Sequence, residues 1–201
     1  DVYITDLLTE HAEDFIANRN KKKPFFVYLS HKAAHDSFTA SKKHEGMYKD
    51  KPIPYPVSYN QPPYGNISTI PSKDQHGTPK KDDAWYGEGR LPDWVKNQRE
   101  SWHGVEYCYF GRKSFEEEYR KYCETITSLD ESIGNLLKFL KENDLEENTV
   151  IIYMGDNGFA WGEHGLIDKR QFYEESVRVP MLAYCPGLIQ PGTQIANMIY
   201  N

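Results

Sequence analysis

The sequence predicts an α/β fold with a mostly parallel sheet and flanking helices, and two observations support this expectation. An amphipathic helical pattern over residues 4–19 precedes a short apolar strand at 25–29. The same order recurs later, where a helical pattern over 115–140 precedes an apolar strand at 149–154. Helices that alternate with short apolar strands are typical of parallel sheets, so we expect this chain to form part of such a sheet.

The residues around these elements indicate where each one begins and ends. Apolar side chains recur every three or four positions over 4–16, and Pro24 follows this helix after three lysines. The second helix begins with a capping box at 114–117, Ser-Phe-Glu-Glu, and its apolar positions continue to Leu140. A third strand is expected over 179–184, where apolar residues return after a glycine-broken loop.

Charge and cysteine content exclude several classes of protein. The 201 residues carry a net charge of −6 and no evident basic face, which argues against nucleic acid as a partner. Cys108, Cys123 and Cys185 lack the number and spacing of a disulfide framework or a zinc motif. No apolar run is long enough to span a membrane, and no segment of these residues has the pattern of a signal peptide. Because the chain begins at Asp1 rather than Met, we expect it to be an internal piece of a longer protein.

Residues 41–105 differ from the rest of the chain. Pro, Gly, Tyr, Trp and Lys dominate there without a sustained period, which predicts a long irregular insertion within a single domain spanning residues 1–201. We expect the insertion to shape a pocket, and its His103 is a candidate substrate-binding residue. The chain holds 15 Tyr and 4 Trp, many of them in loops. Such aromatics favour either a surface that binds a carbohydrate or an aryl ligand, or loops that bury their own rings.

Polar side chains follow two of the predicted strands at the point where each strand ends. Asp156 and Asn157 come soon after the 149–154 strand, and His35 lies shortly beyond the 25–29 strand. Ligands bind at the carboxyl ends of the strands in open α/β sheets, so this edge is the expected site. Asp and Asn oxygens are hard ligands suited to Ca²⁺ or Mg²⁺, but an Asp-Asn-Gly sequence after a strand is, taken alone, more often a turn than a metal ligand.

Several ordered motifs resemble those of the type I sulfatases of the alkaline-phosphatase superfamily. They are Pro-Phe-Phe-Val-Tyr-Leu-Ser-His-Lys-Ala-Ala-His at 24–35, Gly-Asp-Asn-Gly at 155–158 and Gly-Glu-His-Gly-Leu-Ile-Asp-Lys-Arg-Gln-Phe-Tyr-Glu at 162–174. The Asp-Lys-Arg-Gln-Phe-Tyr-Glu wording is most similar to the N-acetylglucosamine-6-sulfatase branch. The resemblance covers residues 1–40 and 106–193, and it implies an alkaline-phosphatase-like fold that is incomplete in this chain.

The resemblance also implies an activity and a set of site residues. It implies a Ca²⁺-dependent hydrolase of sulfate esters on a sulfated sugar, with Mg²⁺ a less favoured metal. Asp156 and Asn157 match two metal ligands, and Lys169 matches the lysine that binds a sulfate oxygen. His35 matches the histidine that contacts the sulfate and assists the leaving group, while His164 matches a position near the substrate pocket. A secreted, periplasmic or lysosomal location is implied as well.

The chain departs from the family pattern in the residues that would complete the site. The family nucleophile is a formylglycine made within a Cys-x-Pro/Ala-x-Arg motif, which is absent here. Cys108 has the spacing to an arginine, but Phe110 occupies the position that must be small, and the segment lies on the wrong side of the 24–35 motif. The paired N-terminal aspartates are missing too. We therefore expect the nucleophile upstream and no turnover by this chain alone.

Two other functions remain open on the sequence. One is a phosphodiesterase or phosphonate hydrolase of the same superfamily, but such enzymes favour transition metals and a histidine where Asn157 stands. An oxygen ligand at this position favours Ca²⁺ and hence a sulfatase. The other is a truncated, non-catalytic remnant that binds glycans, for which the missing nucleophile and the aromatic-rich 41–105 segment are the support.

Overall fold

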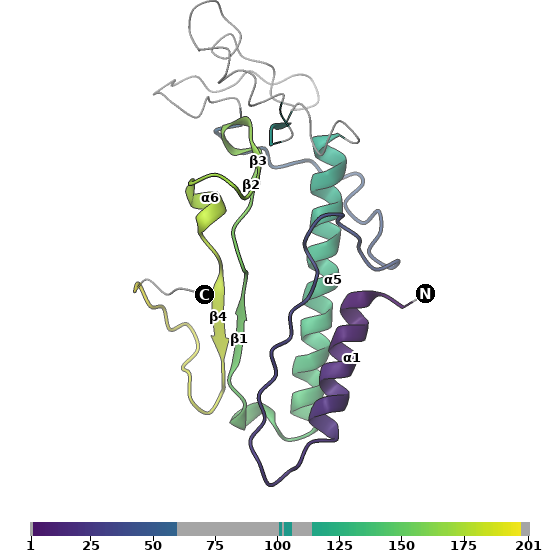
Figure 1. Cartoon of the computed structure of the whole chain (residues 1–201), viewed down its shortest axis with the longest axis vertical. Coiled ribbons are helices and arrows are strands. Elements are labelled where there is room, and N and C mark those ends of the chain that lie inside the picture. Colours follow the sequence, from purple (N-terminus) through teal and green to yellow (C-terminus); the bar gives the residue numbers. More distant parts are fainter. Residues whose placement is uncertain (1, 60–100, 102, 106–113, 198–201) are drawn as a thin grey trace, which may run out of the picture. The chain divides into compact units, whose positions relative to one another are not determined.

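The structure is a computed structural model that describes residues 2–59, 101, 103–105 and 114–197. Its elements are, in chain order, α1 (Ile4–Ala17), α5 (Phe115–Glu142), β1 (Ile151–Met154), β2 (Ala160–Trp161), β3 (Ile167–Asp168), α6 (Glu174–Val177) and β4 (Met181–Tyr184), with 3₁₀ turns at Glu146–Asn148 and Glu163–Gly165 (Figure 1). Both predicted helices and the strands expected at 149–154 and 179–184 are thus confirmed.

The chain divides into two compact units, and each is described by itself. The first, called the helical unit, comprises Asp1–Lys51, Arg120–Tyr153 and Leu182–Tyr200. The second, called the hairpin unit, comprises Pro52–Tyr119 and Met154–Met181. Asp156, Asn157, His164 and Lys169 therefore belong to the hairpin unit together with His103, whereas His35 belongs to the helical unit.

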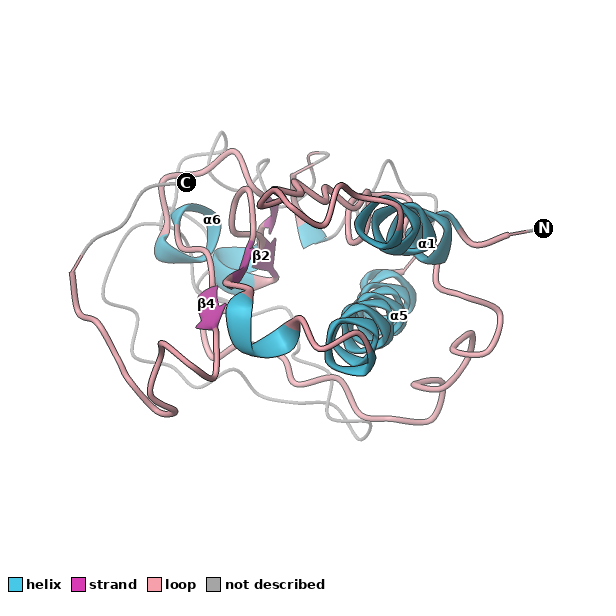
Figure 2. Ribbon diagram, turned by 90° about the horizontal axis from the view of Figure 1, so that it is seen from below, coloured by secondary structure: helices cyan, strands magenta, loops and turns pink. Residues whose placement is uncertain are grey.

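Helices α1 and α5 lie side by side in the helical unit (Figure 2). Small polar side chains meet where they pack, since Thr9 Oγ1 and Ser132 Oγ lie 2.6 Å apart and both residues are buried. Such a pair is stable in a buried position because each hydroxyl satisfies the other. The predicted capping box is confirmed at Ser114, whose Oγ accepts the Glu117 N–H at 3.2 Å. In the described part of the chain, no helix combines the length and the apolar composition needed to cross a membrane.

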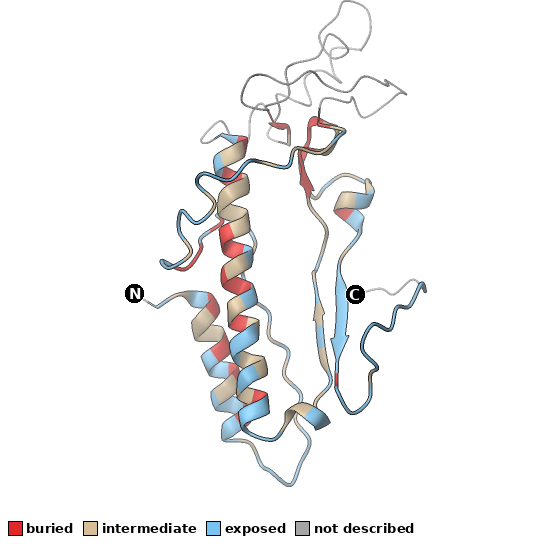
Figure 3. Cartoon of the chain, turned by 180° about the vertical axis from the view of Figure 1, so that it is seen from behind, coloured by how far each residue is buried: buried red, intermediate tan, exposed pale blue. Residues whose placement is uncertain are grey.

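Strands β1 and β4 form a two-stranded sheet. A Cβ at Gly155, after β1, would lie 3.8 Å from Pro180, before β4. At the other end, the Cys185 thiol lies 3.8 Å from the Glu147 carbonyl oxygen. The end of β1 therefore lies beside the start of β4, so these two strands run antiparallel, a pairing that the sequence did not predict. The strands are also less buried than predicted, because every residue of β4 is exposed (Figure 3).

The strand predicted at 25–29 does not form among the described residues. Burial alternates along this segment as it does in a strand, and Phe26 and Tyr28 are both 84% exposed. A strand requires a partner for its N–H and C=O groups, and no described segment pairs with this one. The prediction was wrong because apolar composition shows that a segment suits a sheet but does not show whether another segment of the chain pairs with it.

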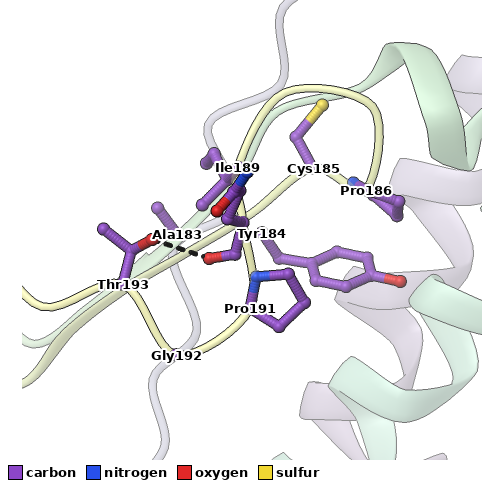
Figure 4. A pocket seen from close by; sticks show the side chains of 9 residues that line it. Ala183, Tyr184, Cys185, Pro186, Ile189, Pro191, Gly192 and Thr193 are labelled. Carbon is purple, nitrogen blue, oxygen red and sulfur yellow. Dashed lines mark hydrogen bonds between the residues drawn. The ribbon is translucent and has the colours of Figure 1, made fainter.

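Two pockets lie within the helical unit. One, of about 340 Å³, is enclosed by the turn after β4, where the Thr193 hydroxyl donates to the Gln190 carbonyl oxygen at 2.8 Å (Figure 4). The other, of about 250 Å³, lies between α5 and the two strands and is mostly apolar. Neither pocket is lined by any of the candidate site residues, so neither is the candidate functional site.

We expect His31 to couple the stability of the helical unit to pH. Its Nδ1 is buried without a hydrogen-bond partner among the described residues. Burial lowers the pKa of His31 below its usual 6.5, and the nearby Asp6 opposes this shift only in part. The unfolded state therefore binds the proton more readily than the folded state. Stability should fall as the pH drops below about 6.5 and should stop falling once the folded imidazole is protonated.

We expect His31→Gln to reduce this loss of stability, because glutamine carries no titrating group into the buried position. The measurement is the free energy of unfolding of the complete protein at pH 7.5 and pH 5.5, from denaturant titrations. His11→Gln is the matched control, since His11 is exposed on α1. If both variants lose as much stability as the wild type between these pH values, then His31 is not responsible.

Candidate functional site

The Asp156–Asn157 turn directly follows β1 and holds both side chains in defined positions. Asp156 Oδ1 accepts the Asn157 N–H at 3.0 Å, and Asn157 Nδ2 donates to the Gly158 carbonyl oxygen at 2.7 Å. The amide nitrogen of Asn157 is thus engaged by the backbone. Its amide oxygen remains an acceptor that can serve a cation, beside the exposed carboxylate of Asp156.

Gly158 fixes this turn against α6. Its N–H donates to the Ser176 carbonyl oxygen at 2.9 Å. A Cβ at Gly158 would lie 2.1 Å from the Glu175 carbonyl oxygen and 2.5 Å from that of Arg178. No side chain fits at these distances, so the close approach of the two backbones requires glycine here.

A small hairpin follows the turn and was not predicted from the sequence. β2 and β3 pair antiparallel, with Ala160 opposite Asp168 and Trp161 opposite Ile167. The connection uses left-handed backbone at Gly162, His164 and Gly165, with φ of 99°, 54° and 71°. The sequence suggested only a glycine-broken loop because strands of two residues carry too little periodicity to be recognised.

Aromatic rings hold the hairpin in place. Trp161 contacts Phe115 and Tyr119 with ring centroids 6.0 and 5.4 Å apart, and Phe115 contacts Tyr59 at 5.3 Å. Tyr59 also covers Gly162, where a Cβ would lie 2.7 Å from its ring. The sequence left two explanations for the aromatic residues of the insertion. For Tyr59, which is 7% exposed, the explanation is that the loop buries its own ring.

His164 lies within the hairpin and packs on the segment that leads into α6. Its ring stacks on Tyr173 with centroids 4.4 Å apart and an angle of 23° between the planes. The His164 N–H donates to Ser58 Oγ at 3.4 Å. Nδ1 of His164 is buried and has no hydrogen-bond partner among the described residues. His164 thus joins the insertion, the hairpin and the start of α6.

His103 also contacts the hairpin. Its Nδ1 is 2.8 Å from Asp168 Oδ2, the same oxygen that binds the Arg170 guanidinium. The Ile167 N–H donates to the His103 carbonyl oxygen at 2.6 Å, and Gly104 forms an antiparallel bridge with Leu166. The insertion is therefore fixed to the hairpin at both of its described ends.

Lys169 follows Asp168 directly and is partly exposed. Among the described residues it has no hydrogen bond or ion pair, so its ammonium group is available to an anion. A continuous series of contacts joins it to the Asp156–Asn157 turn, through β3 and His164 to Tyr173, and through α6 to Gly158.

His35, in the helical unit, is exposed with Nδ1 2.8 Å from the Asp36 carbonyl oxygen.

The Asp156–Asn157 turn fits part of a calcium site. Ca²⁺ takes about six to eight oxygen ligands, and this turn offers a carboxylate and an amide oxygen side by side. Within the described ranges, no group of three His, Cys, Asp or Glu side chains comes together as a metal site. The donor chemistry of the turn therefore suits Ca²⁺, while its number of ligands is below what the ion requires.

Comparison with solved structures identifies the fold. A protein solved in complex with its substrate D-glucosamine-2-N,6-O-disulfate superposes with a TM-score of 0.67 at 27% identity, over 94% of this chain and 44% of that chain. The α/β fold predicted from the sequence is confirmed by this likeness, as an incomplete version of the fold. A model of the Sulfatase family matches residues 2–201, and the chain belongs to this family.

Two relatives are similar over almost all of this chain. The N-acetylglucosamine-6-O-sulfatase of Bacteroides thetaiotaomicron is 27% identical over 228 residues, which cover 99% of this chain and 41% of the relative. The N-acetylglucosamine-6-sulfatase of Bos taurus is 28% identical over 200 residues, which cover 99% of this chain and 30% of the relative. The chain thus spans less than half the length of either relative. The assignment of residues 1–201 to one domain stays a prediction.

The sequence did not identify every residue that organises the site. Asp168 lies inside the Asp-Lys-Arg motif but was not itself chosen, because an aspartate beside two cations has no distinctive spacing. Tyr173 and Ser58 were missed as neighbours of His164, since their contacts join positions far apart in the chain. Cys108 and most of the insertion lie outside the described residues.

The close approach at Gly158 yields a test in the same turn. Gly158→Ala should lower the free energy of unfolding of the complete protein by about 3 kcal/mol, because the added methyl group must push apart two backbones. Gly155→Ala is the matched control, since its Cβ would have its nearest contact at 3.4 Å, and it should cost no more than about 1 kcal/mol. Equal losses in denaturant titrations would contradict the assigned role of Gly158.

Proposed function

We propose that the complete protein hydrolyses sulfate esters on a sulfated sugar and that this chain supplies part of its active site. The observation that carries the proposal is the series of contacts that joins the Asp156–Asn157 turn to Lys169. Oxygen ligands for a cation and a lysine for an anion are thereby held on one framework. The names of the relatives, which are N-acetylglucosamine-6-sulfatases, favour a sulfated hexosamine as substrate.

The chemistry of sulfate ester cleavage suits these residue types. Negative charge develops on the non-bridging sulfate oxygens and on the leaving alcohol oxygen as the S–O bond breaks. Lys169 would bind a non-bridging oxygen through its ammonium group and stabilise the charge that grows there. His35 would donate a proton to the leaving oxygen, a role that suits an imidazole at neutral pH.

A calcium ion is the metal that we propose for the Asp156–Asn157 turn. When bound, it would supply electrostatic stabilisation to the sulfate oxygens. The Asp156 carboxylate contributes the charge that binds the cation, and the Asn157 amide oxygen contributes a neutral ligand. The remaining ligands and the formylglycine nucleophile would come from residues outside this chain. His164 and His103 would border the sugar, and the family resemblance favours a secreted, periplasmic or lysosomal protein.

The decisive assay is release of sulfate from N-acetylglucosamine 6-sulfate by the complete protein, with and without a chelator. We expect turnover that requires Ca²⁺. Lys169→Ala should lower kcat/KM by about 100- to 1,000-fold, because it removes a charge that stabilises the transition state. Lys138→Ala, on the exposed face of α5, is the matched control and should leave turnover unchanged.

Other outcomes of this assay would contradict the proposal. Binding of sulfated glycans without turnover, unchanged by a chelator, would identify a non-catalytic remnant. Hydrolysis of a phosphodiester with a transition metal, but no release of sulfate, would identify a phosphodiesterase of the same superfamily. Turnover that survives Lys169→Ala undiminished would remove Lys169 from the site.

A further inference from the structure

Asp168 combines three features that the proposed reaction does not use. Its side chain is 14% exposed, so its carboxylate is largely removed from solvent. One carboxylate oxygen, Oδ2, contacts both His103 Nδ1 at 2.8 Å and the Arg170 guanidinium. Its backbone has a φ of 102°, which residues other than glycine rarely adopt.

The unfavourable backbone conformation of Asp168 must be stabilised by other interactions, and its side chain supplies them. A non-glycine residue in such a region costs about 1–3 kcal/mol and persists only when the surrounding structure holds it. The two bonds to Oδ2 provide this hold, because charge-assisted hydrogen bonds are among the stronger ones in proteins. The carboxylate therefore fixes the conformation in which the chain leaves β3.

The next residue along the chain is Lys169. The direction in which the backbone turns at Asp168 decides where the Lys169 side chain begins. β3 itself is fixed up to this point, since Ala160 pairs with Asp168 and the Ile167 N–H donates to His103. Asp168 is thus the last held position before the lysine.

We propose that Asp168 is a positioning residue for Lys169, and that His103 and Arg170 act on the lysine through its carboxylate. This inference rests on the proposed role of Lys169 in binding sulfate. His103 comes from the far end of the 41–105 insertion, so the insertion contributes to the placement of the lysine. The ion pair between Arg170 and Asp168 and the strained backbone of Asp168 would thus act together on the position of Lys169.

The test is a double-mutant cycle on the complete protein. Asp168→Asn removes the charge but retains the shape, and asparagine tolerates left-handed backbone. We expect kcat for sulfate release to fall by about 100-fold, as displacement of a catalytic group by about 1 Å would cause, with little change in KM. In the Lys169→Ala background the same substitution should change kcat by less than about twofold, because its effect passes through the lysine.

The matched control is Asp144→Asn. Asp144 also has a positive φ, of 55°, but it is exposed at the end of α5. This substitution should leave kcat, KM and the melting temperature unchanged. If Asp168→Asn lowers kcat equally with and without Lys169, then Asp168 acts independently of the lysine and the inference is wrong.

A second measurement does not depend on the sulfatase activity. The rate at which an amine-reactive reagent labels each lysine can be followed by mass spectrometry. Asp168→Asn should change the labelling rate of Lys169 and leave that of Lys138 unchanged. An unchanged rate at Lys169 would overturn the inference even if sulfate is released. Absence of sulfate release by the wild type would instead contradict the proposed function, while a changed rate at Lys169 would still support the positioning role.

Discussion

The approach of the Gly158 backbone to two carbonyl groups of the α6 segment is the constraint on which the candidate site depends. The Gly158 N–H also donates to the Ser176 carbonyl oxygen, so the end of the Asp156–Asn157 turn is held against α6. A Cβ at Gly158 would lie 2.1 Å from the Glu175 carbonyl oxygen, so there is no room for a side chain at this position. The positions of the Asp156 and Asn157 side chains therefore depend on the absence of a side chain at Gly158, and α6, only four residues long, supports the turn.

The sequence predicted the parts of the fold whose information is local. Periodicity identified α1 and α5, and a capping box located the start of α5, because helices form hydrogen bonds within one segment. The prediction of a strand at 25–29 was wrong for the opposite reason. A strand forms hydrogen bonds with a second segment, and the composition of one segment does not show which segment that is. β1 was located correctly, but its antiparallel partner could not be inferred from a single apolar run.

The candidate site also combines features that local sequence predicted with features that it could not predict. Asp156, Asn157 and Lys169 were chosen because short motifs carry them, and their contacts with the ligand remain predictions. The contacts that organise them were beyond the sequence, because they join distant positions such as His103 with Asp168 and His164 with Tyr173. Backbone strain at Asp168 was also invisible, since aspartate is common in unstrained turns.

Both described ends of the insertion are fastened to one hairpin, by Tyr59 on one side and His103 on the other. The two described parts of the insertion are therefore held on the same hairpin. The entropy of closing a loop grows slowly, by about 0.6 kcal/mol for each doubling of length. Evolution can thus lengthen, shorten or exchange this stretch at little thermodynamic cost, provided that the two fastenings persist. A change in the length of this stretch would therefore leave the hairpin that carries Lys169 in place.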